Sequence, residues 1–212
     1  MLSKRLQSIL EWVDTDVLAD IGCDHGLLCI AAVREKKADR AFAMDIAAGP
    51  LGQAAQNIER EGLQEKITVL LSNGFEKIDP SVSQAVIAGM GAQNVIEMLE
   101  KTDYHKKLLV SVHKDAHQLR KYLGTHGWKI VREKIIDDGH FYPLMDIEPG
   151  EMELDDASLF WGEAVQDSPE YRKFLDHEEK RLQKLLDKIP EDRNMHVRRQ
   201  LESLQAARAK LT

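Results

Sequence analysis

The sequence predicts an α/β fold, with a Rossmann-like, seven-stranded, mostly parallel sheet followed by a helical hairpin. Residues 17–26 join a short apolar run to a glycine turn, and a mostly helix-forming segment over 27–36 follows at once. Further short apolar runs alternate with helix-like segments up to residue 124, a pattern typical of parallel strands joined by helices. After Gly150 the pattern changes to two amphipathic segments, which indicate paired helices.

The first third of the chain supplies three strands and three helices. Residues 2–12 predict a helix that covers the sheet before the first strand. Its apolar residues share one side: Leu6, Ile9, Leu10 and Val13. The strands are short apolar runs at 17–21, 41–45 and 67–71. Helices at 27–36 and 49–61 separate them. Pro50 lies near the start of the second, where proline is tolerated, and Gly62 ends it.

The next part completes the sheet. Apolar runs predict strands at 84–88, 107–112, 127–136 and 141–148. Helices at 92–100 and 114–124 follow the first two of these. The turn at 137–139 joins the last two strands, so they are predicted to form an antiparallel hairpin. Five strand–helix units closed by such a hairpin are typical of class I methyltransferases, an inference about fold that does not by itself establish function.

Residues 168–212 predict an α-helical hairpin with a coiled-coil-like seam. Ser168 and Pro169 form a good helix start, and Pro190 interrupts the helical pattern. Apolar stripes mark its two helices, with Tyr171, Leu175, Leu182, Leu185 and Ile189 on the first and Val197, Leu201, Leu204 and Leu211 on the second. We therefore expect an α/β domain over 1–150, an acidic connector over 151–167 and the hairpin. Both a free-standing arm and a hairpin packed back on the domain agree with these stripes.

Composition indicates a cytoplasmic protein without a membrane segment. The chain has 212 residues, of which 43% are hydrophobic, and this is enough for a sizeable core. No apolar run approaches the roughly 18 residues of a membrane helix, and residues 1–6 lack the apolar core of a signal peptide. The two cysteines, Cys23 and Cys29, have no metal-type spacing and agree with a reducing compartment.

Charge is distributed unevenly along the chain. The net charge is −7, but residues 168–212 hold 11 Lys and Arg against 8 Asp and Glu. Residues 135–171 contain no Lys or Arg and eleven acidic residues. An acidic body with a basic tail is compatible with nucleic-acid binding through the tail, although a solvated helix of mixed charge agrees equally well.

The turn after the first strand indicates the kind of cofactor. A dinucleotide fingerprint needs Gly-x-Gly-x-x-Gly, whereas this turn has Asp20, Gly22, Asp24 and Gly26 at alternate positions. Two carboxylates would repel a pyrophosphate but suit S-adenosyl-L-methionine (AdoMet), which carries a sulfonium and an ammonium group. Asp45 ends the next strand, where a Rossmann-type unit places the acid that binds the ribose hydroxyls. An ordinary strand–turn–helix without a ligand is the alternative.

Because the carboxyl ends of parallel strands meet at one edge of the sheet, the candidate site residues follow these strands. The predicted cofactor-binding residues are Asp20, Gly22, Cys23, Asp24, His25, Gly26, Asp45, Ile46, Asn73, Gly74, Ala88, Gly89 and Met90. The predicted substrate-binding residues are His25, Gly89, Met90, Gly91 and His113. Simpler roles compete with some of these, namely a helix cap for His25 and tight helix packing for Gly89 and Gly91.

Two further patterns favour structural roles. His113, Asp115 and His117 have weak metal-ligand spacing, and a partly solvated helix start explains them better, so we expect no metal. Phe141 and Tyr142 lie in the last strand and are expected in the core, not as a platform for stacking bases.

Four segments together resemble the bacterial tRNA (adenine-22-N1)-methyltransferases, and the resemblance covers almost the whole chain. They are Leu2-Ser-Lys-Arg-Leu6, Ala19-Asp-Ile-Gly-Cys-Asp-His25, Gly49-Pro50 and Ile87-Ala-Gly-Met-Gly91. The resemblance implies methyl transfer from AdoMet to N1 of an adenine in tRNA. The family usually has Gln-Pro-Asn where this chain has Ser111-Val112-His113. A different methyl acceptor and a non-catalytic AdoMet- or RNA-binding homologue are therefore alternatives.

If the resemblance holds, the lone pair on adenine N1 attacks the AdoMet methyl group and the product ring is cationic. A carboxylate near the ring would stabilise that charge, and Asp24 is the predicted catalytic residue. We expect the protein to act as a monomer or a weak dimer.

Overall fold

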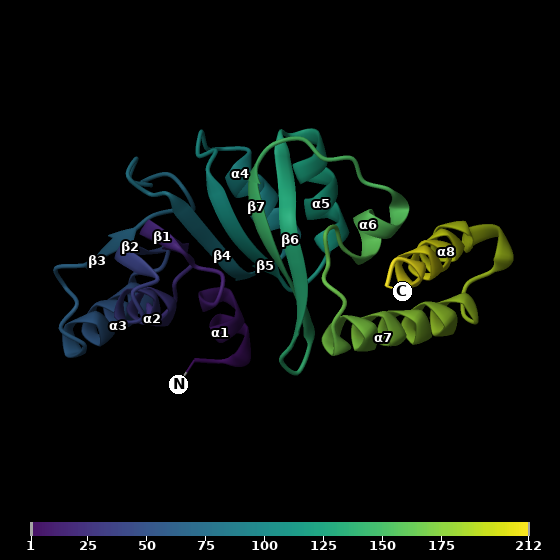
Figure 1. The fold of residues 1–212 in the computed structure, drawn as a ribbon, viewed down its shortest axis with the longest axis horizontal. Coiled ribbons are helices and arrows are strands. Elements are labelled where there is room, and N and C mark those ends of the chain that lie inside the picture. Colours follow the sequence, from purple (N-terminus) through teal and green to yellow (C-terminus); the bar gives the residue numbers. More distant parts are fainter. Residues whose placement is uncertain (1, 212) are drawn as a thin grey trace.

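The computed structural model describes residues 2–211 as a single seven-stranded sheet flanked by helices, with a helical hairpin beyond it (Figure 1). Residues 1 and 212, which end the first and last predicted regions, lie outside the described part. The strands are β1 Thr15–Ile21, β2 Ala38–Asp45, β3 Ile67–Leu71, β4 Gln84–Met90, β5 Lys107–Val112, β6 Trp128–Asp137 and β7 Phe141–Pro149. Their order across the sheet is β3-β2-β1-β4-β5-β7-β6.

The first five strands are parallel, and β7 runs antiparallel to both β5 and β6. The predicted sheet and its closing hairpin are therefore confirmed. In this topology the strand order reverses between β1 and β4, and a ligand crevice forms outside the carboxyl ends at such a reversal. The predicted site residues follow the strands that meet there.

Helices cover both faces of the sheet, and each layer has its own apolar core. These helices are α1 Lys4–Leu10, α2 Leu27–Arg34, α3 Ala48–Arg60, α4 Ala92–Leu99 and α5 Ala116–Thr125. Residues of α1, α2 and α3 pack with Leu18 and Val86 on one face of the sheet. Residues of α4 and α5 pack with Ala19 and Ile87 on the other face. Successive strand residues thus enter opposite cores, which explains why the central strands are continuously apolar.

Most predicted boundaries differ from the observed ones by one to three residues, as in α1, β1, α2 and β2. Two further differences have a cause in the backbone. Strand β4 continues to Met90 through a register shift, so Gly89 lies within its end with φ +84 instead of in a separate turn. The helix predicted from residue 114 begins at Ala116 because Asp115 has a left-handed backbone, with φ 58 and ψ 31.

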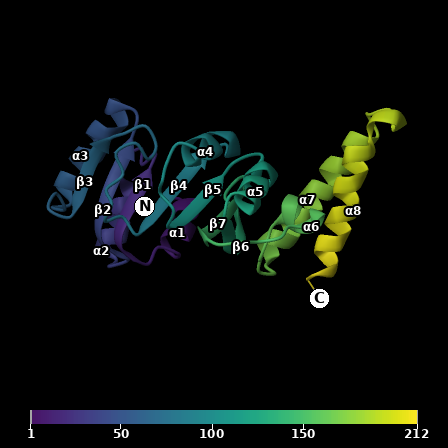
Figure 2. The ribbon, with the colours of Figure 1, turned by 90° about the horizontal axis from the view of Figure 1, so that it is seen from above.

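The carboxy-terminal hairpin is anchored at one end and projects at the other (Figure 2). Its helices are α7 Pro169–Leu186 and α8 Met195–Ala209, joined through a short 3-10 helix, Glu191–Arg193. Tyr171 and Leu175 of α7 pack in one apolar cluster with Ile135 of β6, and Phe141 of β7 lies against this cluster. Ile189 and Leu211 lie beyond the helix ends but pack against the same cluster. The hairpin is thus packed on the sheet domain at its base and projects as an arm at its far end. It combines the two arrangements that the apolar stripes allowed.

The segment 151–167, expected as an acidic connector, contains a short helix, α6 Asp156–Trp161. The Asp155 carboxylate caps it by accepting a hydrogen bond from Ser158 N at 2.7 Å. Trp161 donates its indole hydrogen to Ser203 Oγ of α8 at 2.9 Å. The segment is therefore packed between the sheet domain and the hairpin.

A buried ion pair lies at the junction between the sheet domain and the connector. Arg120 of α5 and Glu133 of β6 are both buried, with Nη2–Oε1 at 2.5 Å and Nε–Oε2 at 3.2 Å. Arg120 Nη1 also donates to the carbonyl oxygens of Leu159 and Phe160, at 3.0 and 3.2 Å. Glu163 N donates to Glu133 Oε2 at 3.1 Å. The pair therefore joins α5 and β6 of the sheet domain to α6 of the connector.

Candidate active site

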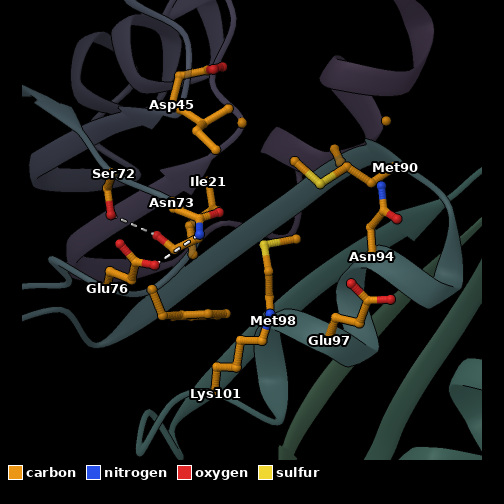
Figure 3. A pocket seen from close by; sticks show the side chains of 16 residues that line it. Ile21, Asp45, Ser72, Asn73, Glu76, Met90, Asn94, Glu97, Met98 and Lys101 are labelled. Carbon is orange, nitrogen blue, oxygen red and sulfur yellow. Dashed lines mark hydrogen bonds between the residues drawn. The ribbon is translucent and has the colours of Figure 1, made fainter.

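A cleft of about 520 Å³ opens at the carboxyl ends of the central parallel strands (Figure 3). We call it the main cleft. It is lined by Ile21, Gly22, Asp45, Ile46, Ser72, Asn73, Gly74, Phe75, Glu76, Ala88, Gly89, Met90, Asn94, Glu97, Met98 and Lys101. Its charged lining consists of three carboxylates and a single lysine. This balance opposes a pyrophosphate and favours a ligand that carries positive charge.

Asp45 ends β2 at one side of the main cleft, and backbone amides fix its carboxylate. Oδ1 accepts a hydrogen bond from Ala47 N at 2.9 Å, and Oδ2 accepts one from Asp24 N at 3.3 Å. A carboxylate oxygen has more than one lone pair, so both oxygens keep capacity for further donors. The position and chemistry suit a pair of ribose hydroxyl groups.

Apolar side chains form another part of the lining. Ile46 is 68% exposed, and Phe75 and Met98 also line the main cleft. Gly74 has φ +58, and a Cβ there would lie 2.8 Å from Met98 Cγ, so glycine allows α4 to approach closely. Asn73 Nδ2 donates to Glu76 Oε1 at 2.8 Å (Figure 3). This combination of apolar surface and amide groups suits a purine ring.

A second pocket of about 250 Å³ adjoins the main cleft and shares Gly22, Ala88 and Gly89 with it. The other lining residues are Arg5, Leu6, Asp20, Cys23, Asp24, His25, Leu27 and Leu28. Gly22 has φ +80, and a Cβ there would lie 2.5 Å from Met90 Cε. Glycine at this position, which lines both pockets, therefore leaves room for the Met90 methyl group.

Two acids that line the second pocket have different surroundings. Asp20 is 5% exposed, and burial together with the nearby Asp45 carboxylate raises its pKa to about 7. The Asp24 side chain is 68% exposed and lies 3.5 Å from His25 Nε2. Burial also raises the pKa of the Cys23 and Cys29 thiols, so neither is poised to act as a thiolate nucleophile.

Most of the predicted site residues line one of the two pockets, but three do not. Gly26 is the N-cap of α2, and a Cβ there would lie 3.1 Å from Ala54 Cβ. Gly91 is buried beside Lys114. The His113 side chain is exposed, and its backbone N donates to Met90 O at 3.1 Å. The neighbour of Gly91 is the Lys114 side chain, with Cε 3.0 Å from where a Cβ would stand, and not another helix.

Sequence reasoning missed the contribution of α4 to the main cleft. Asn94, Glu97, Met98 and Lys101 line it from one side of this helix and its carboxyl end. These residues follow the glycine-rich end of β4 at spacings of three and four, which place them on one side of a helix. The spacing could have indicated that this side faces the cleft. Arg5 lines the second pocket from α1. It was missed as a site residue although it lies in Leu2-Ser-Lys-Arg-Leu6, one of the segments that carry the family resemblance.

Among residues 2–211, no group of three or more His, Cys, Asp or Glu side chains could hold a metal ion. His117 lies against the Phe160 ring with 5.7 Å between centroids, and burial lowers its pKa. Over the same residues, no helix is long and apolar enough to cross a membrane.

Comparison with known proteins places these features among methyltransferases. Residues 2–145 match the family model described as "Methyltransferase domain". The tRNA (adenine(22)-N(1))-methyltransferase of Bacillus subtilis (strain 168) is 34% identical over 173 residues, which are 77% of this chain and 73% of that protein.

Two solved structures have the same fold over nearly their whole length. The M. capricolum TrmK structure, in complex with the cofactor product S-adenosyl-homocysteine, has a TM-score of 0.89 and 27% identity, covering 100% of both chains. The B. subtilis M1A22 tRNA methyltransferase TrmK has a TM-score of 0.85 and 26% identity, covering 98% of both chains. The hairpin as well as the sheet domain therefore has counterparts in these structures.

Proposed function

The chain belongs to the tRNA (adenine(22)-N(1))-methyltransferase family, and from this membership we propose that it methylates N1 of adenine 22 in tRNA, using AdoMet. The observation that carries the proposal is the acidic main cleft at the carboxyl ends of the parallel strands, with a second pocket beside it. One pocket for the methyl donor and an adjoining one for the base are what a transfer between two bound molecules requires.

The residues of the main cleft fit AdoMet. Asp45 is placed for the ribose hydroxyls, and the surface formed by Ile46, Phe75 and Met98 is placed for the adenine ring. The methionine part would extend to Gly22, which lines both pockets, and the Asp20 carboxylate of the second pocket can hold its ammonium group. AdoMet would supply the methyl group from its sulfonium: attack by adenine N1 would form the N–C bond, break the C–S bond and release the neutral thioether S-adenosylhomocysteine.

The second pocket suits the target adenine. Its N1 already carries an exposed lone pair, so the chain needs to orient the ring more than to remove a proton. Because N1 pairs with another base in a duplex, the base must be unpaired before it enters, at a cost of a few kcal/mol. Asp24 stands at the mouth of this pocket, where its charge stabilises the ring as it becomes cationic.

Replacing Asp24 with Asn tests this role without disturbing the loop. Asp24 has φ 51, a left-handed conformation that Asn also adopts readily, whereas Ala would add strain. We expect kcat to fall roughly tenfold to 100-fold, since the negative charge is lost while the shape is kept. Single-turnover methylation measures the chemical step, and calorimetry measures AdoMet binding. Full activity of the Asn variant would exclude a role for the Asp24 charge.

Methylation itself is tested with radiolabelled AdoMet and unmodified tRNA, followed by analysis of the nucleosides. We expect labelled 1-methyladenosine, and no label in a tRNA in which adenine 22 is replaced by guanine. Label in another nucleoside, or no label in RNA while AdoMet still binds, would contradict the proposed reaction. The first result would indicate a different acceptor, and the second a non-catalytic binding protein.

A further inference from the structure

The turn after β3 links Asn73 and Glu76 at the edge of the main cleft (Figure 3). Asn73 Nδ2 donates a hydrogen bond to Glu76 Oε1 at 2.8 Å, and Glu76 N donates one to Asn73 O at 3.3 Å. The two residues are thus joined through their side chains as well as their backbones. Phe75, which lies between them in the chain, belongs to the apolar surface placed for the adenine ring. The linked pair therefore flanks the position proposed for this ring.

The backbone of this turn is fixed by the residue before Asn73. Ser72 is buried, and its hydroxyl group donates to Gly74 O at 3.0 Å and accepts a hydrogen bond from Lys77 N at 3.2 Å. These two bonds hold the chain on either side of Asn73 and Glu76. The turn therefore determines where the Asn73 side chain starts, and the contacts of its amide group determine which way that group is turned.

An asparagine amide can present either an acceptor or a donor to a ligand. Its oxygen and nitrogen have nearly the same shape, so a half-turn about the last side-chain bond exchanges them. Adenine has an amine at C6, which donates a hydrogen bond, whereas hypoxanthine has a carbonyl oxygen there, which accepts one. Asparagine at position 73 therefore does not by itself select adenine.

Glu76 removes this ambiguity. A carboxylate offers acceptors alone, so of the two amide atoms only Asn73 Nδ2 can bond to it, and Oδ1 then lies on the other side of the amide group. Within residues 2–211, Oδ1 accepts no hydrogen bond, and no cation forms an ion pair with Glu76. The lone pairs of Oδ1 are therefore available to an amine of a ligand.

We propose that Glu76 makes the cofactor site selective for adenine, because it fixes the Asn73 amide with its oxygen toward the adenine amine of AdoMet. Glu76 is thus a positioning residue that acts through Asn73. A hypoxanthine base would place its carbonyl oxygen against Oδ1, and two acceptors without a hydrogen between them repel each other. The proposal rests on the use of AdoMet in the proposed function and does not depend on the methyl acceptor.

The test measures the selectivity of the full-length chain for the base, without RNA. S-adenosylhomocysteine and S-inosylhomocysteine differ only in the base, where a carbonyl oxygen at C6 and a hydrogen on N1 replace the amine and the lone pair of adenine. Calorimetry gives the Kd of each ligand, and the ratio of the two Kd values is the readout. We expect the wild type to bind S-adenosylhomocysteine roughly 100-fold more tightly, since a site built for one hydrogen-bond pattern rejects the reverse pattern.

Glu76→Gln is expected to lower this ratio about tenfold, which is the effect of one hydrogen bond. The new amide can accept from Asn73 Nδ2 or donate to Oδ1, so it keeps the hydrogen bond but no longer fixes the Asn73 amide. The affinity for S-inosylhomocysteine should therefore rise. The double variant Asn73→Asp/Glu76→Gln should restore the ratio, because a carboxylate at position 73 offers acceptors in either orientation.

The control is Glu65→Gln, at an exposed acid before β3 and so at the other end of this strand. It makes the same change in net charge and should keep the wild-type ratio. If Glu76→Gln also kept the ratio, or weakened both ligands by the same factor, Glu76 would only support the turn and the proposal would be wrong. A wild type that bound neither ligand would overturn the proposed use of AdoMet as well. A wild type with the expected ratio that methylated no tRNA would reject the proposed reaction alone.

Discussion

Replacing Asp20 with Asn is expected to stabilise the ligand-free protein at pH 8 while weakening AdoMet binding. Burial and the Asp45 carboxylate raise the pKa of Asp20 to about 7, from about 3.9 in an unfolded chain. The folded protein therefore binds the extra proton between these pH values, and its stability falls as the pH rises from about 4 to 7. The shift corresponds to as much as about 4 kcal/mol, a loss that the neutral Asn avoids.

The same substitution removes the charge proposed to hold the AdoMet ammonium group. A charge-assisted hydrogen bond contributes about 1.5–3 kcal/mol, so affinity should fall roughly tenfold to 100-fold. Urea unfolding at pH 5 and pH 8 measures the stability change, and calorimetry measures AdoMet binding. Asp39→Asn, at an exposed carboxylate of β2, serves as the control. If the variant were only as stable as the wild type at pH 8, the ionised Asp20 carboxylate would not destabilise the folded protein, and the prediction would be wrong.

Replacing Glu133 with Gln is expected to lower the free energy of unfolding by about 3–5 kcal/mol. The substitution leaves the Arg120 guanidinium buried without a counter-charge, although its hydrogen bonds to Leu159 and Phe160 remain. Such a loss is a large part of the roughly 5–15 kcal/mol that stabilises a typical domain. Urea unfolding followed by circular dichroism measures it.

The control for Glu133→Gln is the exposed ion pair between Arg34 and Glu61. These groups lie 3.0 Å apart, and their side chains are 61% and 41% exposed. Water screens such a pair, so Glu61→Gln should cost less than about 1 kcal/mol. If Glu133→Gln and Glu61→Gln lost similar amounts of unfolding free energy, the prediction would be wrong, because burial of the ion pair would then make no difference to its contribution.

The sheet was predictable because its signals are local. Apolar runs before Gly22 and Gly89 and the turn at 137–139 are each contained within about ten residues. The junction was not predictable. Arg120 lies in an amphipathic helix where a charged residue normally faces water, and its partner Glu133 occupies a strand that alternates in polarity. The short helix α6 lies in an acidic segment whose order depends on contacts with distant residues.

The candidate site shows the same contrast between local sequence signals and contacts of distant residues. Asp20, Asp45 and Gly89 were found because each follows an apolar run and strand ends converge in this fold. Phe75 was found only when the segment after β3 was placed beside the main cleft. Arg5 belongs to a segment that carries the family resemblance, but its position at the second pocket depends on how α1 packs on the sheet domain. His113 also follows a strand, yet its side chain is exposed outside both pockets, because the position of a strand end does not determine the direction of a side chain.

The junction at Arg120 also determines how the molecule should respond to proteases. A loose acidic linker would be cut first, releasing the hairpin as a fragment. Here residues 151–167 contribute α6, an indole hydrogen bond and two carbonyls held by Arg120, so their amide hydrogens should exchange slowly with solvent. Cleavage should begin instead in the exposed bend around Pro190, far from the sheet. The sheet and the base of the hairpin would then unfold as one cooperative unit.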